Sequence, residues 1–208
     1  MRGVFRSLAR VAALLLLLAA APWTASAQEL KDREVRPAFD FSLIQMPVEF
    51  LSVRLKGREL RPGEKIKGYD DWVKSLSFTL KNVSDKPIAY VEVGLKFPRP
   101  DGFVVYILPY GVDFSRGDSR DKTSPPPIEP GAAVTIVLTE ERYRSLLYVL
   151  DRGNIAKSFD VAPYFIEKVC FEGEPDIIWT GGVLKRRDPE RPTEFKTFER
   201  YALPAKQE

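Results

Sequence analysis

The sequence contains no histidine. This absence excludes the Ser-His-Asp and Cys-His catalytic groups, the HExxH metalloprotease helix and the zinc sites that depend on imidazole ligands. Paired carboxylates remain possible, because glycosidases and aspartic proteases need only two acidic side chains. We therefore expect a protein that is not an enzyme, and we retain a histidine-free enzyme built on carboxylates as an alternative.

Cysteine is nearly absent as well. The only one is Cys170, so no intramolecular disulfide can form and no cluster of thiolates can bind zinc. Cys170 lies in the stretch "FIEKVCFEG", which indicates a small strand residue rather than a reactive thiol. Gly181 and Gly182 in "WTGGVL" lack the spaced glycines and the lysine of a phosphate-binding loop. We expect no cofactor.

Long hydrophobic runs are also scarce. One run ends at Ala21, and it is too short to cross a bilayer as a helix. Three arginines precede it, and small residues follow it at Ala25 and Ala27. This pattern predicts a signal peptide over residues 1–27, cleaved between Ala27 and Gln28. We therefore expect an exported protein, periplasmic or secreted, with no transmembrane segment in its mature chain.

A strong excess of either charge is missing too. The chain has 32 basic and 29 acidic residues, and three of the basic residues lie within residues 1–27, which hold no acidic residue. The part that follows the predicted leader is therefore formally neutral. Binding to nucleic acid requires a basic surface, so we expect no nucleic-acid partner.

What the sequence does contain is a period-two alternation of apolar and polar residues, which is typical of strands with one buried face. In the stretches "VEFLSVRL" and "LSFTLKN", the residues expected to face the core are Leu51, Val53, Leu55, Leu76, Phe78 and Leu80. The alternation slips near Tyr90, which indicates a β-bulge. The polar stretch "NVSDKP" predicts a strand connection that needs only its backbone geometry. We expect a β-sandwich domain over residues 47–187.

One helix is predicted among the strands, at about residues 140–150. Thr139 is suited to cap its N-terminus, and Gly153 follows its end. The apolar stripe that would pack on the sandwich consists of Tyr143, Leu146, Leu147 and Leu150. Outside the domain, we expect residues 28–46 to form a flexible N-terminal arm and residues 188–208 an irregular C-terminal tail.

Two stretches, "LSFTLKNVSDKPIAYVEVGLKF" and "IEPGAAVTIVL", resemble immunoglobulin-like and fibronectin-like β-sandwich modules of exported bacterial proteins. The resemblance implies a mainly β fold, an immunoglobulin-like antiparallel β-sandwich, here with one inserted α-helix. The sequence departs from antibody-type domains because it lacks paired cysteines around a tryptophan. The resemblance implies no activity.

Two groups of residues are candidates for binding. Asp70 and Asp71 in "GYDDWV" are adjacent acids, which favours a turn or a pair of calcium ligands from a loop. The aromatic residues that could stack on a sugar are Trp72, Tyr106, Tyr110 and Trp179, although core packing is the commoner role at inward strand positions.

The function we expect is a non-catalytic binding or assembly module. Its strand edges or loops would pair with another envelope or extracellular protein. The first alternative is a carbohydrate-binding module that uses exposed aromatics to hold a glycan. The second alternative is the carboxylate enzyme.

Overall fold

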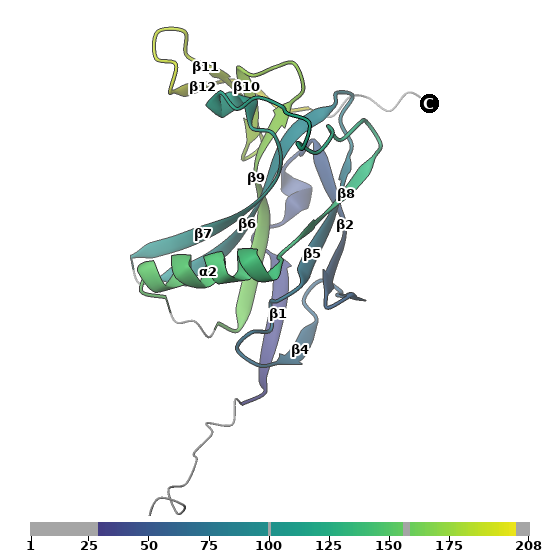
Figure 1. Cartoon of the computed structure of the whole chain (residues 1–208), viewed down its shortest axis with the longest axis vertical. Helices are drawn as coiled ribbons and strands as arrows, with labels where there is room; N and C mark the ends of the chain where they lie inside the picture. Colours follow the sequence, from purple (N-terminus) through teal and green to yellow (C-terminus); the bar gives the residue numbers. More distant parts are fainter. Residues whose placement is uncertain (1–28, 100, 156–158, 203–208) are drawn as a thin grey trace, which may run out of the picture.

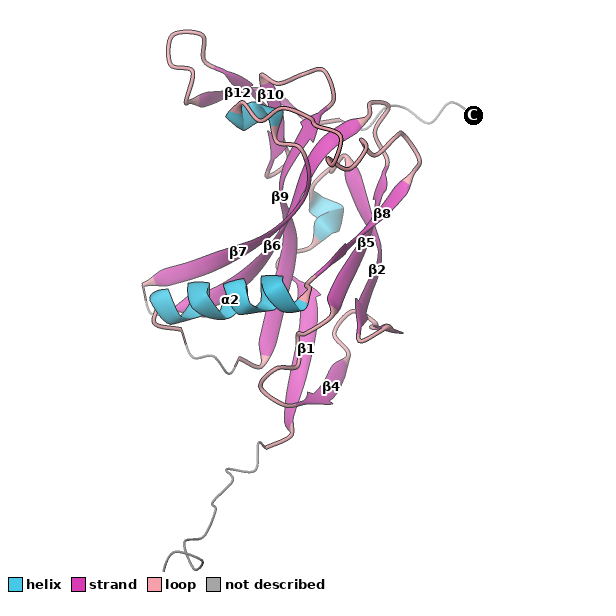
Figure 2. Ribbon diagram, viewed as in Figure 1, coloured by secondary structure: helices cyan, strands magenta, loops and turns pink. Residues whose placement is uncertain are grey.

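The computed structural model describes residues 29–99, 101–155 and 159–202, and it shows a mainly β fold (Figures 1 and 2). The strands are β1 (Lys31–Pro37), β2 (Val48–Leu55), β3 (Arg58–Glu59), β4 (Lys65–Gly68), β5 (Leu76–Asn82), β6 (Ile88–Arg99), β7 (Gly102–Gly111), β8 (Ala133–Val137), β9 (Val161–Phe171), β10 (Ile177–Thr180), β11 (Val183–Arg187) and β12 (Phe195–Arg200). The helices are η1 (Phe41–Leu43) and η2 (Phe114–Arg116), both 3-10, and α2 (Glu140–Arg152). The predicted signal peptide lies outside the described residues.

The strands form two sheets. In the large sheet β9 is central: β6 pairs with one side of it, while β1 and β10 share the other side. β7 lies beyond β6 at one edge, β4 lies beyond β1, and β11 and β12 lie beyond β10. β1 and β9 are parallel, whereas the other pairs of described strands are antiparallel. The small sheet is antiparallel, in the order β3-β2-β5-β8.

The hydrophobic core lies between the two sheets. Leu76, Phe78 and Leu80 of β5 are fully buried, as the alternation predicts. Phe78 meets Tyr164 of β9 across the core, with ring centroids 5.2 Å apart. The face of the large sheet that points to this core is called the inner face below, and the opposite one the outer face.

Helix α2 confirms the predicted helix and runs alongside β7 (Figure 1). The Thr139 side chain accepts a hydrogen bond from the Arg142 backbone N–H, as an N-cap does. The Tyr106 hydroxyl of β7 donates to the Arg142 carbonyl over 2.6 Å. The buried residues of its apolar stripe are Tyr143, Leu146 and Leu150.

Two bulges change which residues face the core. The predicted slip near Tyr90 is confirmed, because the β6–β9 register shifts between Ile88 and Tyr90. The prediction that Leu51 faces inward is wrong. The β2–β5 register shifts between Phe50 and Ser52, so Leu51 is 49% exposed while Phe50 stacks on an aromatic ring of η1.

Strand β1 lies within residues 28–46, where the sequence predicts a flexible arm, and β12 lies within the tail predicted to be irregular. β1 is held in the sheet by Arg33, whose side chain is fully buried. Its guanidinium donates to two backbone carbonyls and forms ion pairs with Asp70 (2.9 Å) and Asp160 (2.5 Å). A polar segment thus enters the sheet because its buried cation finds acceptors on neighbouring segments.

The stretch "NVSDKP" is a connection between β5 and β6, as predicted, but its side chains matter more than its sequence indicates. Asn82 is fully buried, and its amide donates to the carbonyls of Lys86 and Ile128, each over 2.8 Å. The Ser84 hydroxyl donates to the Asn82 side-chain oxygen over 2.7 Å. Because these buried groups satisfy one another, the connection depends on its side chains as well as on its backbone.

Candidate functional site

The four aromatics that the sequence offers for stacking on a sugar do not form an exposed platform. Trp72, Trp179 and Tyr106 are buried, and Tyr110 is partly buried. Both indoles donate to backbone carbonyls, Trp72 to Phe159 (2.9 Å) and Trp179 to Gln45 (3.2 Å). These side chains therefore serve packing, the commoner role at inward strand positions, and three of the four candidates are not exposed for stacking on a sugar.

The two adjacent aspartates are engaged with basic side chains. Asp70 forms an ion pair with the buried Arg33, and Asp71 lies 3.5 Å from the ammonium of Lys74. Over residues 29–99, 101–155 and 159–202, no group of three or more histidine, cysteine, aspartate or glutamate side chains could hold a metal ion.

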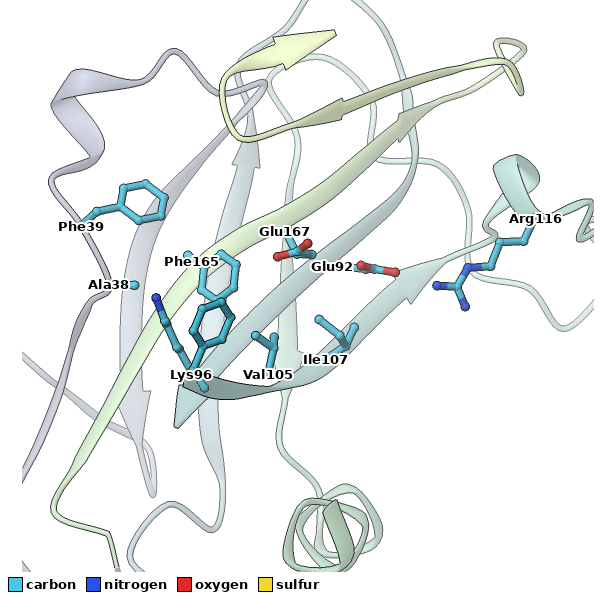
Figure 3. Close-up of a pocket in the computed structure, with 10 residues that line it drawn as sticks. Ala38, Phe39, Glu92, Lys96, Val105, Ile107, Arg116, Phe165 and Glu167 are labelled. Atoms are coloured by element: carbon cyan, nitrogen blue, oxygen red, sulfur yellow. The ribbon is translucent and has the colours of Figure 1, made fainter. Parts of the chain in front are cut away.

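A groove lies instead on the outer face of the large sheet (Figure 3). Its volume is about 430 Å³, and it crosses β6, β7 and β9. We call it the outer groove; its lining residues are Ala38, Phe39, Glu92, Lys96, Phe103, Val105, Ile107, Arg116, Phe165 and Glu167. None of them was among the sequence candidates, because the sequence alone does not show which strands are neighbours.

The middle of the outer groove is apolar because of one glycine. Gly94 of β6 has no side chain, and a Cβ there would lie 2.7 Å from the ring of Phe165. The absence of this Cβ lets the ring lie close to the sheet. Phe103 is 54% exposed, and the ammonium of Lys96 lies 4.0 Å from the centre of its ring. This cation–π contact holds the ammonium over one face of the ring.

Glu167 is placed in the groove by a bulge in β9. The β6–β9 register passes from the pair of Glu92 with Lys168 to the pair of Val93 with Ile166, so Glu167 has no opposite residue. Figure 3 shows its carboxylate beside that of Glu92, between the Phe165 ring and Arg116. Burial and, second, the charge of Glu92 raise the pKa of Glu167.

The two carboxylates differ in their partners. Glu92 is buried, accepts a hydrogen bond from the Tyr90 hydroxyl over 3.0 Å and lies 3.5 Å from the ammonium of Lys168. The Glu167 side chain is partly buried, and its carboxylate forms no hydrogen bond or ion pair with any residue that the structure describes, although the charges of Lys168 and Lys185 act to lower its pKa. Glu167 is therefore a groove carboxylate without an ion-pair partner among the described residues, and Lys96, whose ammonium lies over the Phe103 ring, is a groove cation of which the same holds.

Lys168 connects the groove to the loop that carries η2. Its ammonium forms an ion pair with Asp113, which is 3% exposed and also accepts from the Ser115 hydroxyl (2.5 Å). Burial raises the pKa of Asp113, but hydrogen bonds from Lys168 and Ser115 and the charge of Lys168 together hold it below its ordinary value of 3.8. The buried carboxylates of Glu92 and Asp113 thus share the Lys168 cation, and Asp113 also pairs with Arg116 over 3.2 Å.

Cys170 lies behind the same cluster. Its thiol is fully buried, 3.5 Å from the Asp113 carboxylate, and burial raises its pKa to about 12. The thiol therefore stays protonated at neutral pH and is a poor nucleophile. The outer groove offers apolar contact, the unpaired carboxylate of Glu167 and the basic side chains of Lys96 and Arg116. The carboxylate suits a ligand cation with apolar flanks.

Comparisons with protein-family models, curated proteins and solved structures found no match for this chain. Within the described ranges, no helix is long and apolar enough to span a membrane.

Proposed function

We propose that this protein is a non-catalytic binding module and that the outer groove holds a segment of a partner protein. The observation that carries this proposal is Glu167, a partly buried carboxylate without an ion-pair partner among the described residues, at the wall of an apolar groove. Desolvating a charge costs free energy unless an opposite charge compensates it. A ligand cation would supply that compensation.

The chemistry of the groove favours a lysine or arginine side chain flanked by apolar residues. The cation would pair with Glu167, and its neighbours would contact Phe103, Val105 and Phe165. A glycan receives less support, because the polar groups of the groove are few and charged. A carboxylate enzyme receives less support as well, because Glu92 is already paired with Lys168.

We also propose that the two facing sheets are an elaborated immunoglobulin-like sandwich and that the protein is exported. The antiparallel small sheet and the strand–connection–strand unit at β5 and β6 support the first statement, and the composition of residues 1–27 supports the second. Mass spectrometry of secreted or periplasmic material is expected to find a mature chain that starts at Gln28. An intact Met1 on such material would contradict export.

The binding proposal can be tested with nine-residue peptides in which valine alternates with threonine around a central lysine, arginine, norleucine or glutamate. We expect the lysine and arginine peptides to bind about tenfold more tightly than the norleucine peptide, the size of one charge-assisted hydrogen bond. Two-dimensional NMR titration would measure the affinities and would show whether the shifts map to the groove. Glu167→Gln should remove the preference, whereas the matched variant Glu49→Gln, at an exposed carboxylate of β2, should retain it.

The same Glu167→Gln variant is expected to be slightly more stable than the parent at neutral pH. A raised pKa means that ionisation of Glu167 opposes folding, so the gain should disappear below its ordinary pKa of 4.5, where the carboxyl is protonated in both states. Thermal melts at pH 7 and pH 4 would show this.

The binding proposal fails if no peptide shifts groove resonances, or if an oligosaccharide such as cellohexaose does so instead.

A further inference from the structure

Two prolines show which backbone groups of β7 point toward its free edge. Pairs along β6 and β7 alternate between hydrogen-bonded and non-hydrogen-bonded ones. Pro109 pairs with Glu92 and Pro98 with Phe103, and because proline has no N–H, both pairs belong to the non-hydrogen-bonded set. Residues in this set do not hydrogen-bond across the pair. The N–H and C=O groups of Phe103, Val105 and Ile107 therefore point away from β6, toward the free edge.

One end of this edge is closed and the rest is open. The Arg142 guanidinium donates to the Pro109 carbonyl (3.0 Å) and to the Val137 carbonyl of β8 (3.0 Å), so it bridges the two sheets. No hydrogen bond between described residues reaches the outward backbone groups of Phe103, Val105 or Ile107. Since α2 contacts β7 through inner-face side chains such as Tyr106, these groups are left free.

The composition of β7 also distinguishes it from the other described edges. Strands β3, β4 and β12 carry arginine or lysine, which discourages pairing with another chain, and β8 (Ala133–Val137) is uncharged but does not line the outer groove. β7, by contrast, has no charged residue over Gly102–Gly111. An uncharged edge beside the groove is a template for a further strand.

We infer that the free edge of β7 from Phe103 to Ile107 receives an extended segment of the partner protein as an added β-strand. The inference rests on the proposed function, because the edge borders the outer groove: Phe103, Val105 and Ile107 supply its outward backbone groups and also line the groove. Alternate side chains of the added strand would stand on the same face as these three and extend the apolar wall. Backbone hydrogen bonds supply affinity in this mode, and the groove supplies selectivity for an apolar segment with one basic residue.

The test uses the lysine peptide with single backbone N-methyl groups. If it binds as a strand, methylation at every second position should weaken binding about tenfold, because those N–H groups face β7, while methylation at intervening positions should have little effect. Val105→Pro should weaken the parent peptide similarly, because it removes an outward N–H without touching the β6 ladder. Val105→Thr keeps the amide and the β-branched shape and should bind normally.

Amide hydrogen exchange gives a second readout that does not depend on Val105→Pro folding. In the free protein the amides of Phe103, Val105 and Ile107 should exchange faster than those of Val104 and Tyr106, and the peptide should protect them. Groove binding with no period-two methylation pattern and no new protection would overturn the added strand and leave the proposed function standing. Protection in the free protein that increases with concentration, together with a dimer in sedimentation, would show that a second copy occupies the edge and would also overturn the inference.

Discussion

Replacing Phe78 with alanine is expected to lower the free energy of unfolding by about 3–5 kcal/mol, the usual range for a buried aromatic side chain. Its ring is fully buried and lies 5.9 Å from the ring of Phe50 and 5.2 Å from that of Tyr164, between centroids. The substitution would leave a cavity where the two sheets meet. Denaturant unfolding followed by circular dichroism would measure the loss.

The adjacent Thr79 provides the control for this measurement. It points to the other face of β5, and its hydroxyl lies 3.1 Å from that of Thr135 on β8. Thr79→Ala should therefore cost less than about 1 kcal/mol, as a cross-strand pair does. Similar losses for the two variants would contradict the assignment of the two faces.

Replacing Lys168 with methionine is expected to lower the free energy of unfolding by about 3–5 kcal/mol at neutral pH, because it leaves the buried Glu92 without its cation and the buried Asp113 with Arg116 alone. Glu92 lies 3.5 Å from the ammonium, and Asp113 is 3% exposed. The double variant Lys168→Met/Glu92→Gln should recover part of the loss, since it removes the buried charge that has lost its cation. Chemical unfolding of the three proteins at pH 7 would check this.

The effect of Lys168 should also depend on pH. The pKa of Asp113 in the folded protein is lower than its ordinary value of 3.8, so its stabilising contribution is present above that value and is lost as the pH falls further. The difference between the parent and Lys168→Met should therefore shrink on acidification below about pH 4. A difference that stays constant would show that Lys168 acts through packing alone.

Much of the fold can be predicted from local patterns. The alternation in β5 and the capped apolar stripe of α2 are decided within a few residues, so both are predicted correctly. Leu51 is predicted wrongly because a bulge depends on the partner strand as well as on the sequence of β2 itself. β1 is missed because the groups that hold Arg33 lie in segments distant in the sequence.

The site is harder to predict because its parts come from separate segments. Phe39, Phe103 and Phe165 meet only when β6, β7 and β9 pair in their observed register. The sequence does carry one signal, the polar face of β6 on which Gly94 lies between Glu92 and Lys96. The sequence does not reveal the bulge that turns Glu167 into the groove. Glu167 and Lys168 are adjacent charged residues, and such pairs are common at solvated strand positions.

The parallel pairing of β1 with β9 has a consequence for how the chain reaches its fold. Glu34 lies opposite Val161, so the strand nearest the described N-terminus must find one that follows β2 to β8 and α2 in the sequence. β6 and β10 depend on β9 as well. Contacts so distant in sequence cost loop-closure entropy before they contribute any stability. The large sheet therefore cannot close during synthesis until β9 has emerged. Until then β1 and β6 lack their pairing with β9.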